Sequence, residues 1–201
     1  KNIEVYTNDI LDEESADFSI HLDYNKPKSK KNYLLVIEPP IIIKENHNIK
    51  RLNEFNKVFT WNDDLVNNKK IHKYNLPRDF PIIKNADKKF HRGICMIVAN
   101  KKSNNKNENY SFRKEVINFF ESSNLKFDLF GIGWDKYTSS NRYINYIFKN
   151  FNVKPPLSYA GVVNDKLVAA SNYDFQFAIE NSKNINGYIS EKIFDCFLSG
   201  N

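Results

Sequence analysis

The chain has 201 residues, of which 41% are hydrophobic and 14% aromatic, so it can bury a sizeable core and is not a disordered protein. Its formal charge of +6 would suit a phosphate-bearing ligand, an anionic membrane surface or a nucleic acid. The chain has no stacking or groove-reading motif, so we expect no nucleic-acid partner. It also has no run of 18 apolar residues, so we expect no transmembrane helix.

Short strands separated by polar turns are predicted in the first part of the chain. Runs rich in β-branched and aromatic residues place these strands at 3–6, 18–22, 33–37 and 57–61. Pro39 and Pro40 end the third strand, because proline lacks a backbone N–H and restricts the residue before it. Apolar residues recur at three-residue steps within 46–56, which predicts a short helix there.

The second part of the chain alternates strands and helices. A polar, proline-bearing stretch at 77–92 predicts a connection between two halves. Beyond it, apolar runs predict strands at 93–99, 127–130 and 175–179. Apolar spacing predicts helices at 112–120, 166–171 and 191–198. This alternation is typical of a parallel α/β sheet.

Several large or sulfur-bearing side chains are candidates for the core. We expect Phe175 and Phe177 to be buried rather than to contact a ligand. Trp61 and Trp134 are expected to be packing residues, although Trp134 could instead line a ligand cleft. The two cysteines, Cys95 and Cys196, each lie in an apolar run and are expected to be buried free thiols, with a disulfide left open.

The segment after the last predicted strand carries the most chemical information. The strand is followed by Glu180, Asn181 and Ser182, and a helix is predicted to begin at Ser190, a good N-cap residue. Ligands of open α/β sheets bind beyond the carboxyl ends of the strands, where helix N-termini offer N–H groups to phosphate. Lys192 is unexpected in the first turn, because its charge opposes the helix dipole. A bound anion would remove that conflict.

This segment resembles the hallmark of glycosyltransferase family 10, the α1,3/4-fucosyltransferases. The family pattern is an aromatic-rich strand, Glu-Asn-Ser, a short loop, Tyr-(Val/Ile)-Thr-Glu-Lys and a helix that runs to a glycine. Here it stands as 175–182, then Tyr-Ile-Ser-Glu-Lys at 188–192, then Gly200. Two weaker similarities lie upstream in the family's order: Arg113 before the strand 127–130, and Glu38 before a proline.

The resemblance implies an α/β fold of GT-B type, with two Rossmann-like halves that face a cleft. The N-terminal half, 1–85, would be the acceptor side, and 86–201 would bind the donor nucleotide. The family continues beyond the last residue of this chain, so the C-terminal half would be truncated. The implied activity is the inverting transfer of fucose from GDP-fucose to a sugar hydroxyl of a glycan acceptor. Another nucleotide-sugar donor, or a non-catalytic relative that binds sugar nucleotides, remains open.

The resemblance also assigns roles to individual residues. Arg113 and Lys192 would bind the diphosphate, because fixed cations stabilise the charge that develops on the leaving phosphate. Glu191 would accept hydrogen bonds from the ribose, and Tyr188 would pack beside the guanine. Glu38 would be the general base that takes the proton of the acceptor hydroxyl. Three further residues would line the sugar end of the donor: Glu180, Asn181 and Ser182.

The expectations about a metal ion, a cofactor and cellular location rest on motifs that the chain lacks. It has no Asp-x-Asp pair, and Asp63 and Asp64 are contiguous and predict a turn, so we expect no metal ion and no cofactor beside the donor. It has no recognisable signal peptide, which favours the cytoplasm. Peripheral association with a membrane through basic patches is left open.

Overall fold

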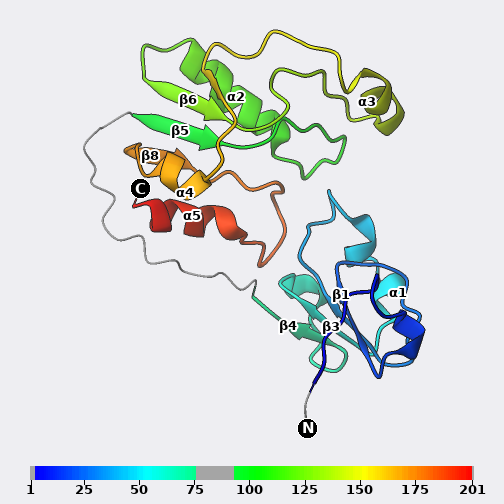
Figure 1. Ribbon diagram of the computed structural model, residues 1–201. Coiled ribbons are helices and arrows are strands. Elements are labelled where there is room, and N and C mark those ends of the chain that lie inside the picture. Colours follow the sequence, from blue (N-terminus) through cyan, green and yellow to red (C-terminus); the bar gives the residue numbers. More distant parts are fainter. Residues whose placement is uncertain (1–2, 76–92, 201) are drawn as a thin grey trace. The chain divides into compact units, whose positions relative to one another are not determined.

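Two α/β units make up the chain (Figure 1). The computed structural model describes residues 3–75 and 93–200. The first unit comprises Lys1–Leu76 with Asn184–Tyr188, and the second comprises Pro77–Lys183 with Ile189–Asn201. The connection expected at 77–92 and the division expected between 85 and 86 lie outside the described residues, so both stay predictions.

The sheet of the first unit has four parallel strands that follow one another in chain order. They are β1 (Ser19–Leu22), β2 (Asn32–Leu35), β3 (Lys57–Thr60) and β4 (Ile71–Lys73). The first three confirm predicted strands, whereas β4 was not predicted. The strand predicted at 3–6 is wrong: residues 3–10 are exposed and none of them pairs with a described strand.

Short helical turns connect these strands. They are η1 (Glu13–Ser15), η2 (Lys44–His47), α1 (Ile49–Leu52) and η3 (Asp63–Leu65). The helix predicted within 46–56 is confirmed only for a single turn, which begins after the Asn48 cap. The turn predicted at Asp63 and Asp64 is η3, and Asn62 caps it by accepting from the Asp64 N–H at 3.0 Å.

The core of the first unit lies between this sheet and α1. Leu34, Val58 and Ile71 come from successive strands, and Leu52 and Phe55 cover them from the connection between β2 and β3. Trp61 completes this core, as predicted, and is 1% exposed. Its indole Nε1, the only polar atom of the side chain, donates to the Ile37 carbonyl at 3.0 Å, so the buried ring has no unsatisfied hydrogen-bond donor.

The sheet of the second unit is also parallel, but its order is β7-β6-β5-β8. The strands are β5 (Ile94–Ile97), β6 (Phe127–Phe130), β7 (Tyr159–Gly161) and β8 (Phe175–Phe177). The chain therefore adds β6 and β7 on one side of β5 and then returns to add β8 on the other side. This is the order of a Rossmann-like half, with a reversal between β5 and β8.

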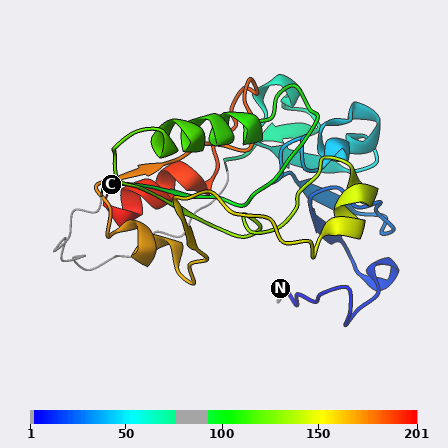
Figure 2. The same ribbon diagram turned by 90° about the horizontal axis from the view of Figure 1, so that it is seen from above.

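Helices cover both faces of the second sheet. They are α2 (Tyr110–Glu121), α3 (Arg142–Phe148), α4 (Lys166–Ala170) and α5 (Glu191–Ser199). The helices α4 and α5 pack against each other, and Figure 2 shows α2 and α4 on opposite sides of the strands. Right-handed crossovers require this arrangement. The strand order reverses after β7, so the connection from β7 to β8, which contains α4, crosses the face opposite to α2. The helices α2, α4 and α5 confirm predictions, whereas α3 was not predicted.

The core of the second unit lies between β5, β6 and α2. Met96, Ile117 and Leu129 are at most 2% exposed, and the buried indole of Trp134 packs with them as predicted. Phe177 packs against this cluster, but Phe175 is 66% exposed. The prediction that Phe175 is buried is therefore wrong, because β8 is an edge strand and this side chain lies on an uncovered part of it.

Both cysteines are buried free thiols, as predicted. Burial, with a smaller contribution from Cys196, raises the pKa of the Cys95 thiol to about 12, so Cys95 is not a ready nucleophile. Within residues 3–75 and 93–200, no helix combines the length and apolarity needed to cross a membrane.

Candidate functional site

The carboxyl ends of β5 and β8 mark the reversal in the second sheet. In open parallel sheets the connections that leave two such strands run to opposite faces, which opens a crevice at that edge. The helix α2 follows β5 and α5 follows β8, so both helix N-termini lie at this end of the sheet. Six of the eight residues singled out in the sequence belong to this unit: Arg113, Glu180, Asn181, Ser182, Glu191 and Lys192.

Glu180 occupies the N-terminus of α5. Its carboxylate accepts from the Ser190 backbone N–H at 2.7 Å and from the Ser190 hydroxyl at 2.6 Å. Ser190 is 4% exposed and is the N-cap of α5, as predicted. A carboxylate is favourable there because the end of the helix dipole is positive. The protein itself therefore provides one anion at the position where the sequence predicted a bound one.

Lys192 lies between two carboxylates. Its Nζ is 3.6 Å from Glu180 Oε2 and 3.2 Å from Glu191 Oε1, and it donates to the Ser190 hydroxyl at 3.1 Å. Burial alone would raise the pKa of Glu191, but the Lys192 charge and hydrogen bonds outweigh it, so this pKa is below its ordinary value. The conflict between Lys192 and the helix dipole is thus resolved by ion pairing within the first turn.

Arg113 is the buried cation of the site. It is 3% exposed on the inner side of α2, and its Nη2 donates to the Ile179 carbonyl at 2.5 Å and to Asn181 Oδ1 at 3.0 Å. Its guanidinium also lies 5.3 Å from the centre of the Tyr110 ring. Arg113 therefore joins α2 to the chain that leaves β8, and Asn181 is positioned by that contact.

A short antiparallel pairing holds the same segment to the start of α2. Asn109 N–H donates to the Asn181 carbonyl at 3.0 Å, Lys183 N–H donates to the Asn107 carbonyl at 2.8 Å, and Glu108 forms a bridge with Ser182. The Ser182 side chain is buried, and its hydroxyl has no hydrogen-bond partner among the described residues. A loop residue such as Asn109 is not a sequence candidate, because its role depends on pairing with a distant strand.

Glu38 belongs to the first unit, just beyond the carboxyl end of β2. Its N–H donates to Asp23 Oδ1 at 2.9 Å, and its carbonyl accepts from Asn46 Nδ2 at 3.0 Å. Asp23 Oδ1 also accepts from Asn46 at 2.7 Å. The Glu38 backbone is therefore fixed at the carboxyl edge of the first sheet, and its side chain is half-buried.

His47 also lies at this edge and was not a sequence candidate. Its Nε2 is 3.3 Å from the Glu38 carbonyl, and its Nδ1 is 3.1 Å from Asn62 Nδ2. A carbonyl only accepts and an amide nitrogen only donates, so these contacts assign the neutral tautomer with the proton on Nε2. Burial lowers the pKa of His47, which also favours the neutral ring. His47 thus supports the chain at Glu38.

Tyr188 belongs to the first unit as well. Its ring lies 4.6 Å from that of Trp61, centre to centre, and it packs against the first core. The neighbouring Gly187 has φ of +79°, and a Cβ there would lie 2.3 Å from the Trp61 carbonyl. Only glycine permits this close approach, so Gly187 allows the segment 184–188 to pack against the first unit.

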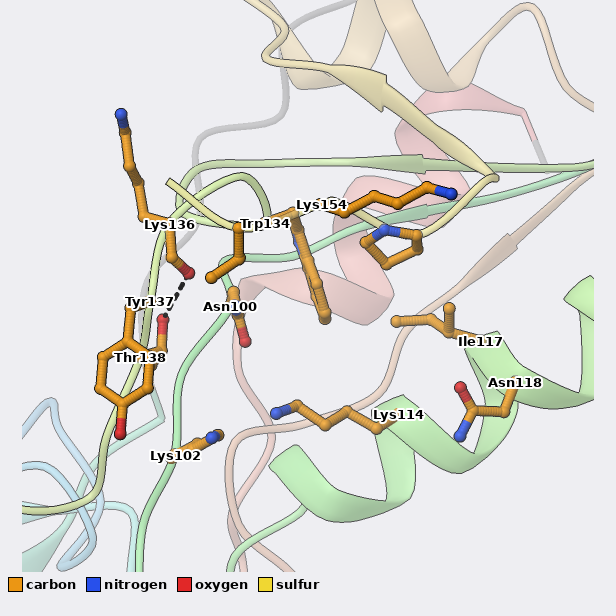
Figure 3. A pocket seen from close by; sticks show the side chains of 12 residues that line it. Asn100, Lys102, Lys114, Ile117, Asn118, Trp134, Lys136, Tyr137, Thr138 and Lys154 are labelled. Carbon is orange, nitrogen blue, oxygen red and sulfur yellow. Dashed lines mark hydrogen bonds between the residues drawn. The ribbon is translucent and has the colours of Figure 1, made fainter. Parts of the chain in front are cut away.

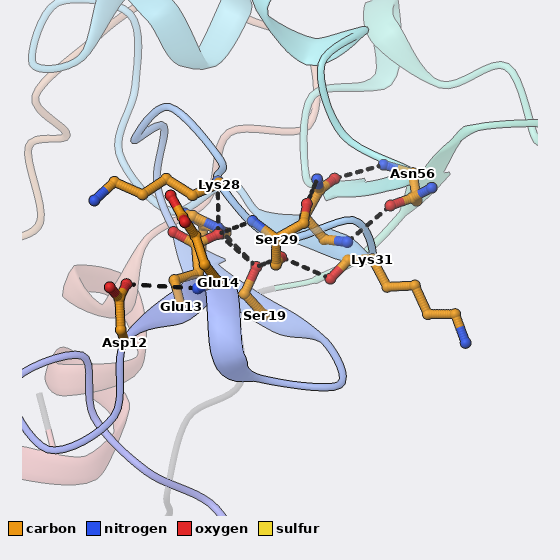
Figure 4. A network of polar contacts seen from close by, with 10 residues as sticks. Asp12, Glu13, Glu14, Ser19, Lys28, Ser29, Lys31 and Asn56 are labelled. Atoms are coloured by element: carbon orange, nitrogen blue, oxygen red, sulfur yellow. Dashed lines mark hydrogen bonds and ion pairs between the residues drawn. The ribbon is translucent and has the colours of Figure 1, made fainter.

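A second polar cluster of the first unit resembles a Ser-His-Glu constellation (Figure 4). Glu13 Oε1 accepts from the Ser29 N–H at 3.1 Å, and the Ser19 hydroxyl lies 2.9 Å from the same oxygen. His21 Nε2 is 3.0 Å from both Ser19 Oγ and Glu13 Oε1. In a Ser-His-acid relay the serine and the acid contact different nitrogens of the histidine ring. Here both contact Nε2 of His21, so this cluster is structural rather than a nucleophile relay.

The second unit has two polar clusters near the end of β8: Arg113 with Asn181, and Lys192 with Glu180 and Glu191. Arg113 and Lys192 supply two positive charges, and Glu180 and Glu191 supply two negative ones. Among residues 3–75 and 93–200, no group of three or more His, Cys, Asp or Glu side chains could hold a metal ion. Comparisons of the chain with family models, curated proteins and solved structures gave no match.

Proposed function

We propose that the chain is an inverting glycosyltransferase that transfers fucose from GDP-fucose to a sugar hydroxyl of a glycan acceptor. The two units would be the halves of a GT-B arrangement, with the donor in the second unit and Glu38 of the first unit facing it. The observation that carries the proposal is the position of Lys192 and Glu180 at the N-terminus of α5, beside the reversal between β5 and β8.

The proposed reaction is a single displacement at the anomeric carbon. The acceptor oxygen forms a bond to that carbon while the bond to the β-phosphate breaks, and its electron pair leaves with GDP. The Glu38 carboxylate takes the proton of the acceptor hydroxyl. Lys192 stabilises the charge that develops on the leaving phosphate, which requires its ammonium to exchange a carboxylate contact for a phosphate contact. Glu191, freed by this exchange, is available to accept from the ribose hydroxyls.

A donor screen by thermal shift tests the first part of the proposal. GDP and GDP-fucose are expected to raise the melting temperature of the chain, whereas UDP is not, because a ligand that binds only the folded state stabilises it. Equal shifts with UDP-sugars would replace GDP-fucose with another donor.

Two substitutions separate binding from transfer. Lys192→Ala is expected to weaken GDP binding at least about tenfold, as loss of a charge-assisted contact does. Lys183→Ala removes an exposed lysine nearby and is the matched control, which should leave GDP affinity unchanged. Glu38→Gln is expected to keep GDP-fucose binding and abolish transfer, measured by release of GDP in the presence of acceptor. Turnover by Glu38→Gln would refute the assignment of the base.

A binding protein without transferase activity is the second candidate. It is favoured by the state of Arg113, whose buried guanidinium donates to Ile179 and Asn181 and so belongs to the framework of the site. This candidate predicts GDP-fucose binding with no turnover on any glycan acceptor. Turnover that disappears in Glu38→Gln would exclude it.

A further inference from the structure

A cavity of about 300 Å³ lies in the second unit, beside α2 and the loops that follow β5 and β6 (Figure 3). It shares no lining residue with the Glu180 and Lys192 cluster. Its volume is at the lower end of the range for small-molecule sites. Ile117, Trp134 and Pro156 give it an apolar side, and its polar lining includes four lysines: Lys102, Lys114, Lys136 and Lys154.

The four lysines are not equivalent. The Lys136 ammonium donates to the Asn152 side chain and lies 4.0 Å from Asp135 Oδ2, so it already has partners. In Figure 3 the ammonium groups of Lys136 and Lys154 point away from the cavity. Those of Lys102 and Lys114 point into the space beneath Trp134, toward each other. Among the described residues, neither Lys102 nor Lys114 forms an ion pair with a carboxylate within 4.0 Å.

The facing lysines repel each other. Burial lowers the pKa of Lys114, and the charge of Lys102 lowers it further, against a smaller opposing effect of Glu108. Lys102 has a different contact, with its ammonium 5.8 Å from the centre of the Tyr137 ring. Lys114 is half-buried whereas Lys102 is exposed, and an anion between the two ammonium groups would convert their repulsion into attraction.

An unused acceptor borders the same space. Asn100 Nδ2 donates to the Gly133 carbonyl at 2.9 Å, which fixes the orientation of the amide. Its Oδ1 accepts no hydrogen bond from the described residues and is directed toward the cavity (Figure 3). The atom has almost no solvent-accessible surface, so a ligand hydroxyl reaches it only when the side chains that cover it shift. A buried acceptor without a donor is costly, so a ligand hydroxyl at this position would be stabilising.

We propose that this cavity binds a small phosphate monoester with hydroxyl groups, such as a sugar phosphate. Lys102 and Lys114 bind the phosphate, Asn100 accepts from a hydroxyl, and Trp134 with Ile117 packs against the carbon frame. A phosphate monoester carries about two negative charges at neutral pH, which match the two ammonium groups, whereas a carboxylate would leave one unmatched. The site uses none of the residues assigned to the nucleotide donor and stands independently of that proposal.

Calorimetric titration with three probes tests the site: glucose 6-phosphate, inorganic phosphate and glucose. Glucose 6-phosphate is expected to bind most tightly, inorganic phosphate more weakly, and glucose not at all. Lys102→Met and Lys114→Met should each weaken glucose 6-phosphate binding about tenfold or more, as loss of a charge-assisted hydrogen bond does. Lys136→Met lines the same cavity and is the matched control, with an expected loss of less than about threefold.

Asn100→Ala separates the hydroxyl contact from the phosphate contact. It is expected to weaken glucose 6-phosphate and leave inorganic phosphate unchanged, provided that its melting curve shows a folded protein. If Asn100→Ala fails to fold, equal affinity of the wild type for glucose 6-phosphate and inorganic phosphate would overturn the hydroxyl contact. Equal losses in Lys136→Met and Lys114→Met, or no binding by the wild type, would overturn the site. GDP affinity unchanged by Lys114→Met would show that this site is separate from the proposed donor site.

Discussion

The two sheets of this protein have the same number of parallel strands but different strand orders. In the first sheet the order is β1-β2-β3-β4, so every connection advances in the same direction. In the second the order is β7-β6-β5-β8, and the direction reverses after β7. Right-handed connections place all crossovers of the first sheet on one face and divide those of the second between two faces. Only the second sheet therefore has a reversal at which two helix N-termini converge.

The polar groups at the two carboxyl edges reflect this difference. In the first unit they satisfy one another: Asp23 Oδ1 accepts from the N–H groups of Ile37 and Glu38 and from Asn46. In the second unit the edge retains groups that the described chain does not satisfy, namely the Ser182 hydroxyl and Asn100 Oδ1. Orphaned buried polar atoms favour a ligand. The comparison teaches that topology, rather than composition, decides at which carboxyl edge of the described sheets buried polar groups are left without a hydrogen-bond partner.

The largest effect is expected from the two tryptophans, one in each core. Both indoles donate to a carbonyl that follows a strand, Trp61 to Ile37 at 3.0 Å and Trp134 to Val98 at 2.8 Å. Trp61→Ala is expected to destabilise the first unit by about 3–5 kcal/mol, through loss of a large buried side chain. Hydrogen exchange should show lost protection in β2 and β3. Trp134→Ala is the reciprocal variant, with the loss expected in β5 and β6.

These variants test whether the two units are separate units of stability. If either variant lowered protection equally in both sheets, the division into two units would not describe the energetics. If Trp61→Ala cost less than about 1 kcal/mol, its core packing would be much looser than its 1% exposure indicates.

An intermediate effect is expected at the carboxyl end of β6. Gly131 has φ of +132°, and a Cβ there would lie 2.1 Å from the Val98 carbonyl. Gly161 also has a positive φ, of +100°, but nothing lies within 4 Å of its Cβ position. Gly131→Ala is therefore expected to cost about 1–3 kcal/mol more than Gly161→Ala in urea denaturation. Equal costs would mean that backbone strain, rather than the close approach of β5 and β6, requires glycine at 131.

Local patterns predicted most of the sheet strands, and their failures have a common cause. The strands β4 and β7 have three residues each, too few to show alternation, whereas the equally short β8 was predicted because it lies in the longer apolar run 175–179. The helix α3 has no buried residue, so its sequence lacks the apolar periodicity of a packed helix. The run at 3–6 has the composition of a strand but no partner in the described chain, because pairing is a property of the fold.

The candidate site shows the same limit. The N-cap at Ser190 depends on neighbouring residues and was predicted. The ion pair of Lys192 with Glu180 was not predicted, because it forms only when the loop between them folds back to the end of β8. The contacts of Arg113 with Ile179 and Asn181 depend on strand order, which short-range spacing does not encode. Residue types could therefore be predicted for the site, but their pairings could not.

The smallest effect on stability is expected at low pH, from protonation of Glu13 in the first unit. Burial raises the pKa of Glu13, but hydrogen bonds from the N–H groups of Lys28 and Ser29 and from Ser19 outweigh it and hold the pKa at about 2. In the unfolded chain this carboxyl takes up a proton near 4.5, so between pH 4.5 and 2 the unfolded state binds more protons. The contribution of Glu13 is therefore complete above pH 4.5 and is lost as the pH falls toward 2. Because the group is partly solvated, we expect it to be about 1–2 kcal/mol.

Glu13→Gln tests this contribution by urea denaturation from pH 2 to 7. The variant should lose stability at pH 7 and show a flatter dependence between pH 2 and 4.5, whereas Glu14→Gln, at its exposed neighbour, should follow the wild type. In hydrogen exchange the loss should fall on β1, since Glu13 contacts Ser19 and His21 of that strand. Loss confined to the second sheet would contradict the separation of the two units, because the partners of Glu13, which are Ser19, His21, Lys28 and Ser29, lie in the first.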